Sequence, residues 1–387
     1  TKVSGSSISL IFSADEKYAQ NNANQTVTVT VGSASIEAGD ALSVLAYADA
    51  YMYAKTYADS GGLFEDGTLQ AKNALTRNVN IYIQSGADLK AGMDFDTSGN
   101  LTVLAETGTD DYLYAEATGT SAGLATVGEA YAKTSMTSNT NVYIYTGASL
   151  LDYFNAVYVK ALTGTTAYTK GHYGSVGLGS YPEAKSEYNH DSLEYHLNAH
   201  VYIGTTGSST ENADITGKNV TIYAGAYKIY ISSYSYAKTT GLHGTAHAYS
   251  YVDLNMDIGV QADKADLNAY ENLSVKANAT PIKGGTSVYC YAGTKITAFV
   301  GHIYSYAYLY GSTSAWVTFG SNTTVRAQNA TISATRFNGG VSLTATGTRR
   351  AIAKKTTDTD DYLSRSTSVS VASATYSIGG GAAGIVV

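Results

Sequence analysis

One stretch of sequence decides the fold: residues 42–55 read Leu-Ser-Val-Leu-Ala-Tyr-Ala-Asp-Ala-Tyr-Met-Tyr-Ala-Lys. Small or apolar residues occupy every second position from Val44 to Ala54, and mostly tyrosine or charged residues fill the positions between them. Side chains alternate between the two faces of a β-strand, so this period of two predicts a long strand with a small, apolar face and a tyrosine-rich face. A helix would scatter the same small residues around its circumference.

The first residues of this stretch belong to a pattern that recurs along the chain. Its central residues lie 53 to 63 positions apart and are Val44, Val103, Val159, Ile222, Val275 and Ile332. A second landmark, Gly-Leu, begins at Gly62, Gly123, Gly177 and Gly241. A third, an apolar-x-apolar strand, aligns on Val79, Val142, Val201, Ile258 and Val317. Three landmarks in the same order predict an internal repeat of just under sixty residues in about six copies.

Each repeat is expected to form one coil or arch: a strand, a glycine turn, a return strand and a second turn. Glycine supplies the positive φ that such turns often need. Stacking would pair equivalent strands of neighbouring copies, so we predict an all-β protein, a β-solenoid or stack of β-arches with about six repeats. An alternative with three smaller coils per copy stays open. The expected regions are an N-terminal cap (1–24), the six-repeat region (25–373), and a C-terminal strand with a Gly-rich tail (374–387).

Composition agrees with extended structure and excludes several classes of protein. The 387 residues include 35 Tyr, 39 Gly, 2 Pro and 1 Cys, and 14 % are charged, against about 25 % in an average protein. Collagen, a disulfide scaffold and a coiled coil are excluded, and 44 % apolar residues argue against intrinsic disorder. The net charge of −7 gives no footprint for nucleic acid, and no apolar run is long enough for a transmembrane helix. Because the chain starts at Thr1, we expect a mature or excised form.

The order of motifs over residues 78–125 resembles the repeats of very large filamentous adhesins of bacteria. Asn-Val-Asn-Ile-Tyr-Ile-Gln-Ser-Gly-Ala-Asp-Leu-Lys-Ala (78–91) precedes Leu-Thr-Val-Leu-Ala (101–105) and Ser-Ala-Gly-Leu-Ala (121–125). The resemblance covers nearly the whole chain and implies a secreted β-solenoid, although the tyrosine content departs from that pattern. In composition and architecture the chain is also similar to the amyloid-like sheath proteins of methanogenic archaea. That resemblance implies subunits stacked edge to edge around a cell.

Two motifs of catalytic or metal-binding type receive structural interpretations. Residues 119–123 read Gly-Thr-Ser-Ala-Gly, a nucleophile-elbow pattern that requires a helix after it, but another alternating stretch follows. We therefore expect a turn. The pairs His196/His200 and His243/His247 could bind zinc on a helix, whereas residues i and i+4 of a strand lie about 13 Å apart. We expect exposed histidines on a sheet face and no metal site.

Acidic residues, one cysteine and several asparagines are further candidates. Asp110 and Asp111 are expected to be solvated loop charges, with calcium binding or glycosidase chemistry as alternatives; the same holds for Asp358, Asp360 and Asp361. Cys290 is expected to be a buried thiol, and the alternative is an intermolecular disulfide that locks a polymer. Glycosylation sequons, which also suit turns before strands, begin at Asn24, Asn100, Asn219, Asn272, Asn278, Asn322 and Asn329.

The tyrosine-rich strand faces are the predicted functional surface. We expect them to form ladders between repeats and contacts of an assembly, with ligand binding as the alternative. This assembly or ligand face comprises Tyr47, Tyr51, Tyr53, Tyr112, Tyr114, Tyr234, Tyr236, Tyr304, Tyr306, Tyr308 and Tyr310.

The function expected from these features is structural rather than enzymatic. We predict an extracellular or cell-surface protein without cofactors whose main partner is itself, a homo-polymer formed by strand-edge pairing into a sheath, surface layer or filament. Ordinary edge strands carry Pro and Lys, which are scarce here. The alternative is an adhesin segment that binds glycans or other surface proteins. A polysaccharide-cleaving β-helix enzyme ranks last, because no acidic constellation recurs on one face.

Overall fold

A computed structural model of the chain describes residues 1–387 except 9–11, 94–98, 187–193, 283–286, 321, 336–339, 355–361, 370–372 and 387. The side chains of residues 5–15, 186–194, 283–287, 299–300, 308–311 and 336–386 are likewise not described. Within this description the regular structure is entirely β-strand, and it contains no helix that is long and apolar enough to cross a membrane.

The strands run in chain order through a single hydrogen-bonded system. They are β1 (Lys2–Ile8), β2 (Phe12–Val31), β3 (Ser35–Glu37), β4 (Leu42–Ala48), β5 (Tyr51–Gly61), β6 (Phe64–Ile83), β7 (Asp88–Lys90), β8 (Leu101–Thr107), β9 (Tyr112–Ile144), β10 (Ser149–Ser186), β11 (Glu194–Ile203), β12 (Ala213–Ala262), β13 (Ala265–Asn278), β14 (Ser287–Phe319), β15 (Thr324–Arg326), β16 (Asn329–Thr335), β17 (Gly340–Lys354), β18 (Tyr362–Val369) and β19 (Ser373–Val386).

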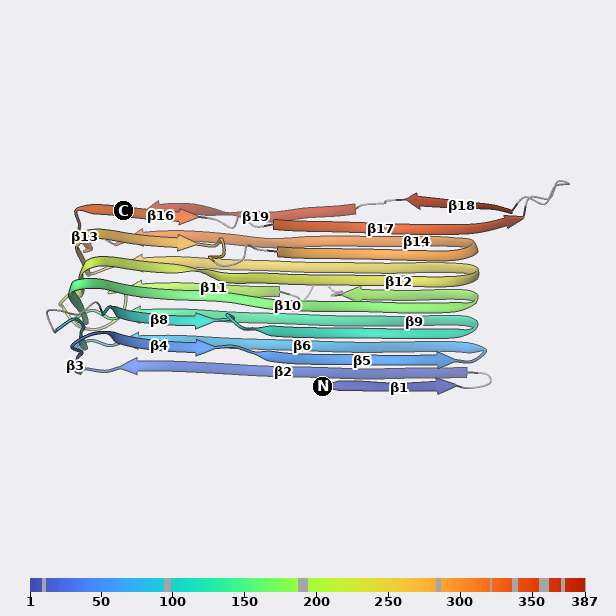
Figure 1. The fold of residues 1–387 in the computed structure, drawn as a ribbon, viewed down its shortest axis with the longest axis horizontal. Helices are drawn as coiled ribbons and strands as arrows, with labels where there is room; N and C mark the ends of the chain where they lie inside the picture. Colours follow the sequence, from blue (N-terminus) through green and yellow to red (C-terminus); the bar gives the residue numbers. More distant parts are fainter. Residues whose placement is uncertain are drawn as a thin grey trace.

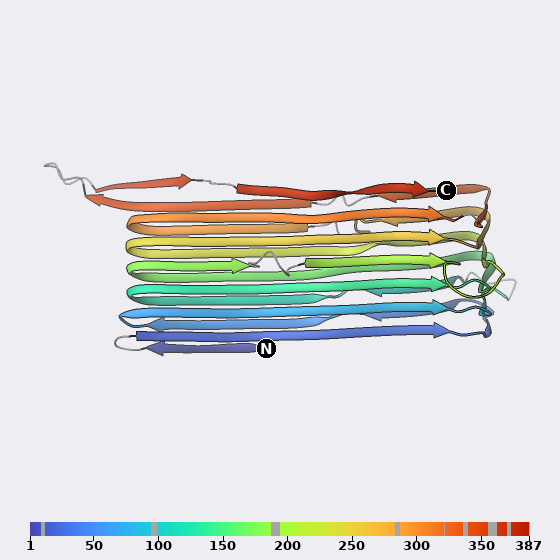
Figure 2. The same cartoon turned by 180° about the vertical axis from the view of Figure 1, so that it is seen from behind.

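Each circuit of the chain, which we call a rung, has two long sides and one short side. The chain runs along one long side, reverses at a rounded bend and returns along the other (Figures 1 and 2). In β9, β10 and β12 the strand continues through the bend, which explains lengths of 33, 38 and 50 residues. The short side lies opposite the bend and contains β3, β7 and β15.

Successive rungs pair in parallel, and the first sequence landmark marks equivalent positions. The five successive pairs are Val44–Val103, Val103–Val159, Val159–Ile222, Ile222–Val275 and Val275–Ile332. Among the described strands the antiparallel pairing is that of β17 with β18. Residues 1–24, predicted to form a cap, contribute β1 and most of β2, which pair in parallel with β5 and β6 as in any other rung.

The third landmark was aligned wrongly in two places. Ile81 pairs with Val142, although the sequence alignment put Val79 there, and Val201 pairs with Val260 in place of Ile258. Both errors are shifts of two residues. A shift of two leaves every side chain on the same face of the sheet, so an alternating pattern alone does not distinguish the two registers.

The core lies between the two long sides and follows the predicted alternation. Each second residue from Val44 to Ala54 is at most 8 % exposed, whereas Tyr51 between them is 76 % exposed. Near the short side the core is made of Val, Ile and Leu, and towards the bend alanine predominates. There the two sides approach closely: the Ser233 and Ser250 hydroxyls, on opposite sides, are 2.8 Å apart. The small-residue face therefore permits the close approach expected of a dry interface.

The Gly-Leu landmarks lie in the bends, but the reason for glycine differs from the prediction. None of the four glycines is among the positive-φ residues of the described chain. A Cβ on Gly123 would lie 2.2 Å from the Gly62 carbonyl oxygen, and one on Gly241 would lie 1.6 Å from that of Gly177. Glycine is required because the backbone of one rung passes too close to the next for any side chain.

Candidate assembly interface

Tyrosine side chains of successive rungs stack along the outer faces of the sheets. Tyr82, Tyr143 and Tyr202 form a column whose ring centroids are 5.0 Å apart at both contacts. Burial, with the two neighbouring tyrosines, raises the pKa of Tyr143 to about 12. Such aromatic pairs contribute about 0.5–1.5 kcal/mol beyond the area that they bury. The columns therefore stabilise the pairing of one rung with the next.

The predicted tyrosine face is divided among several such columns. Tyr47 is 47 % exposed in β4, whose one partner among the described strands is β8. The side chains of Tyr308 and Tyr310 lie outside the described residues. The contacts of the other predicted residues are Tyr51 with Tyr112, Tyr53 with Tyr114, Tyr234 with Tyr291, Tyr306 with Tyr249, Tyr236 with His172, and Tyr304 with His247.

Asparagine amides form similar ladders on the outer faces. Asn139 donates to Asn78 at 2.9 Å and Asn198 donates to Asn139 at 2.8 Å. Three of the sequon asparagines are paired in register and bond through their amides at 2.8 and 3.1 Å: Asn219, Asn272 and Asn329. In this structure the asparagines serve to join rungs.

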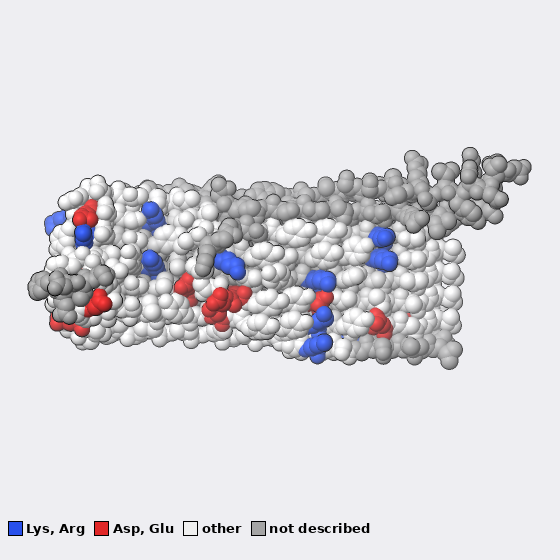
Figure 3. Space-filling view, in the orientation of Figure 1, with Lys and Arg blue, Asp and Glu red and all other residues white. Residues whose placement is uncertain are grey.

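Charges of opposite sign also meet in register at one position of three neighbouring rungs. Glu116 lies between Lys55 and Lys170, with carboxylate–ammonium distances of 2.6 and 3.0 Å. Burial would raise the pKa of Glu116, but hydrogen bonds from both lysines and from the Tyr114 hydroxyl outweigh it and lower the pKa to about 2. Figure 3 shows basic and acidic side chains gathered in short columns across the strands. A carboxylate held between two cations joins three rungs.

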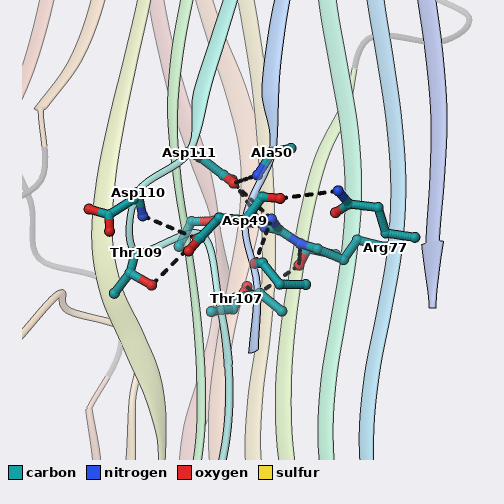
Figure 4. A network of polar contacts seen from close by, with 12 residues as sticks. Asp49, Ala50, Arg77, Thr107, Thr109, Asp110 and Asp111 are labelled. Carbon is teal, nitrogen blue, oxygen red and sulfur yellow. Dashed lines mark hydrogen bonds and ion pairs between the residues drawn. The ribbon is translucent and has the colours of Figure 1, made fainter. Parts of the chain in front are cut away.

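A fully buried ion pair joins the two long sides at the break between β4 and β5 (Figure 4). Arg77 of β6 donates to both carboxylate oxygens of Asp111, at 2.8 and 3.0 Å, and both side chains are 0 % exposed. The guanidinium also donates to the Ala48 carbonyl at 3.1 Å, the Gly164 carbonyl at 3.4 Å and the Ser138 hydroxyl at 3.2 Å. All five guanidinium N–H groups thus have an acceptor.

This pair satisfies backbone groups where the strands are interrupted. β4 ends at Ala48 and β5 begins at Tyr51, and Asp111 accepts the Ala50 N–H at 2.8 Å while Arg77 donates to the Ala48 carbonyl. Next to it, the Asp110 N–H donates to the Asp49 carboxylate at 3.1 Å (Figure 4). The pair therefore replaces ladder bonds at a break in the sheet and is closed to any ligand.

The prediction of solvated loop charges was wrong for Asp111, which is 4 % exposed. The sequence analysis missed Arg77 altogether. The one sequence signal is that Arg77 falls on the face occupied by Leu75 and Val79, both buried. A charge at a core position of a strand indicates a buried partner.

The other predicted chemical motifs fall into ordinary sheet positions. Ser121 of the Gly-x-Ser-x-Gly motif is buried in β9 and pairs in register with Ser60 and Ser175. His200 is 9 % exposed and not an exposed face residue; it contacts Asp257 at 3.0 Å and Asn141 at 3.2 Å. No group of three His, Cys, Asp or Glu side chains in the described part of the chain could hold a metal ion.

Cys290 is buried in the core with 0 % exposure, so the folded chain does not present this thiol for an intermolecular disulfide. Its neighbours Tyr289 and Tyr291 lie on the outer face, where their rings stack. Asp358, Asp360 and Asp361 lie outside the described residues. The thiol therefore belongs to the packing of the core.

In the part of the chain that the structure describes, strands at the two ends of the stack pair along one edge each. At the end drawn lower in Figure 1, each strand pairs with one other strand: β1 with β5, β2 with β6, β3 with β7, and β4 with β8. At the end drawn upper in Figure 1, β15 and β16 pair with β13. The lower edge includes residues 25–31, Gln-Thr-Val-Thr-Val-Thr-Val, with neither charge nor proline. Unpaired N–H and C=O groups of such an edge are a template for another strand.

Among the described residues, the core of the short side is less covered in its first and last members than in between. One apolar column runs through the short side, and its four inner members are 0 % exposed: Leu89, Leu150, Ile215 and Leu267. Its end members, Ile36 in β3 and Val325 in β15, are each 38 % exposed. An apolar column of this kind is buried only where a neighbouring rung covers it.

Comparisons with family models, with curated proteins and with solved structures return no match for this chain.

Proposed function

We propose that this protein is a structural subunit that assembles end to end outside the cell, into a sheath, surface layer or filament. We interpret the stack as a β-solenoid of about six repeats, since the landmark residues pair in register. The subunit then needs no cofactor and catalyses no reaction. Its partner is a second copy of itself.

The single observation that carries this proposal is the core column of the short side, whose described end members are more exposed than its inner members. Ile36 and Val325 are 38 % exposed, whereas the members between them are sealed. Placing Val325 of one copy against Ile36 of the next would continue the column in the spacing that it already has. β3 and β15 are three residues long and β4 and β16 seven, so the edges that would meet match in length.

Charge at the two ends is complementary in the same register. Glu37 of β3 pairs with Lys90, and its carboxylate lies 2.9 Å from the Lys90 ammonium. At the upper end of this column Arg326 is exposed. End-to-end stacking would place Glu37 between Lys90 and the Arg326 of the next copy, the arrangement that Glu116 already has between two lysines.

The test replaces one end of the core column by a charge. Ile36→Lys should leave a folded subunit, because the side chain is partly exposed in a single copy, but should abolish assembly. Ser35→Lys, on the outward face of the same strand, is the matched control and should assemble. Electron microscopy and sedimentation velocity measure both. A wild-type chain that stays monomeric at high concentration, without regular polymers, would refute the proposal.

An adhesin segment that binds glycans is the second candidate. A hollow of about 540 Å3 on the outer face of β2, β6 and β9 favours it, since Gln20, Gln70, Lys72 and Tyr131 among others line it. These are polar and aromatic groups suited to sugar hydroxyls. Binding on a glycan array that is lost in Lys72→Ala, in a chain that does not polymerise, would favour this candidate over the first.

A further inference from the structure

A row of exposed leucines follows the rounded bends of successive rungs. Leu63, Leu124, Leu178 and Leu242 each follow a stacked glycine of the bend, and their exposed fractions are 41, 45, 52 and 59 %. The Leu124 N–H donates to the Leu63 carbonyl at 2.9 Å, so the backbones of these rungs are in direct contact. We call these four residues the leucine ridge.

Further large apolar residues flank the ridge on both long sides. Phe64 and Val127 are each 50 % exposed, Val176 is 55 % exposed and Tyr181 is 46 % exposed. The bends of the two middle rungs, residues 119–128 and 173–182, contain no charged residue. The rim of this end is uncoloured on the face seen in Figure 3. A contiguous apolar surface of this kind marks an interaction site.

We infer that the leucine ridge is a lateral contact, and that its occupant is the leucine ridge of a second copy of this chain. The argument is one of period. Equivalent residues of neighbouring rungs repeat at the spacing of paired strands, about 4.8 Å. A partner matches the ridge over its whole length only if it presents apolar side chains at the same interval. A second ridge does so, and its leucines can interdigitate as in the interface between two paired sheets.

The inference goes beyond end-to-end assembly but combines with it. Because the ridge runs along the stacking direction, subunits stacked through their ends would carry a ridge continuous over many copies. Two stacks would then associate side by side, and weak contacts repeated along them would add up. The proposed function supplies the stack, and the leucine ridge would hold neighbouring stacks together.

The experiment separates the ridge from the ends by using the end-blocked chain Ile36→Lys. We expect this chain to dimerise, as measured by light scattering after size-exclusion chromatography. Adding Leu124→Lys and Leu178→Lys should make it monomeric, with a dissociation constant raised at least a hundredfold. The matched control adds Thr120→Lys, an exposed residue of the same bend that is not on the ridge, and should still dimerise.

Each outcome decides one question. An end-blocked chain that is monomeric before any ridge substitution overturns the inference, and so does a dimer that survives both leucine substitutions. Co-sedimentation of a monomeric chain with phosphatidylcholine vesicles, lost with the leucines, would assign the ridge to lipid instead and also overturns it. Polymers that form in the ridge variant without the end block, but as single stacks, support both the inference and the proposed function.

Discussion

Removing Arg77 tests the claim that one buried ion pair holds the interrupted strands together. In Arg77→Met the Asp111 carboxylate stays buried with the Ala50 N–H as its remaining donor. The Gly164 carbonyl loses the Arg77 donor as well, and the Ala48 carbonyl keeps the Gly108 N–H, which donates to it at 3.1 Å. Breaking a buried pair on one side costs about 3–5 kcal/mol, and we expect Arg77→Met to fall in that range.

The loss should be local, because each rung of a stack contacts its neighbours alone. We therefore expect faster amide hydrogen exchange in residues 42–61 and 101–122, measured by mass spectrometry on the full chain, with little change beyond residue 250. Adding Asp111→Leu to Arg77→Met should cost little more than Arg77→Met alone, since the uncompensated charge is gone. This non-additivity distinguishes a coupled pair from two independent residues.

The matched control is an exposed ion pair of the same charge types. Lys218 and Glu271 are 3.5 Å apart and each side chain is 46 % exposed. Lys218→Met should change the free energy of unfolding by less than about 1 kcal/mol. If Arg77→Met costs no more than this control, or if exchange accelerates evenly along the chain, the reasoning about the buried pair is refuted.

Three further predictions concern the glycine stack, the charged column and the tyrosine column. Gly241→Ala should lower the free energy of unfolding in urea by about 1–3 kcal/mol, because the added Cβ clashes with a backbone oxygen. Gly179→Ala should be near neutral, because nothing lies within 4 Å of its added Cβ, and equal effects of the two substitutions would contradict the prediction. The depressed pKa of Glu116, about 2, stabilises the fold above about pH 4.5, and this contribution, on the order of 2 kcal/mol, is lost as the pH falls towards 2. Glu116→Gln should flatten acid unfolding in that window. The raised pKa of Tyr143, about 12, stabilises below pH 10, and the contribution is lost as the pH rises towards 12; Tyr143→Leu should reduce the alkaline transition seen by tyrosine absorbance.

Much of the fold was predictable because one physical rule, the alternation of side chains along a strand, governs nearly the whole chain. Val44, Ala46 and Met52 were assigned to the core from that rule, and all three are buried. The same rule is blind to shifts of two residues, which is why Val79 and Ile258 were aligned with the wrong partners. Faces follow from parity, whereas registers depend on loop lengths that vary between rungs.

The candidate interface was predictable only in part. Tyrosine and asparagine columns follow from repeated residues at equivalent positions, once the register is known. The pairing of Arg77 with Asp111 does not, since the residues are 34 positions apart and come from different sides of neighbouring rungs. Neither does the exposure of Ile36, whose residue type is that of its buried equivalents. The exposure of a core residue depends on whether a neighbouring rung covers it, and the residue type does not record this.

The sequence by itself determined that the chain is built of long strands with one small, apolar face, that similar segments recur, and that tyrosine lines the other face. Local alternation and repetition suffice for these conclusions. Tertiary structure alone decided the register of each rung, the close backbone contact that requires glycine in the bends, the burial of Arg77 and Asp111, and the exposure of Ile36 in a column whose inner members are buried. These depend on distances between segments far apart in the chain, and a periodic sequence is compatible with several such arrangements until packing selects one.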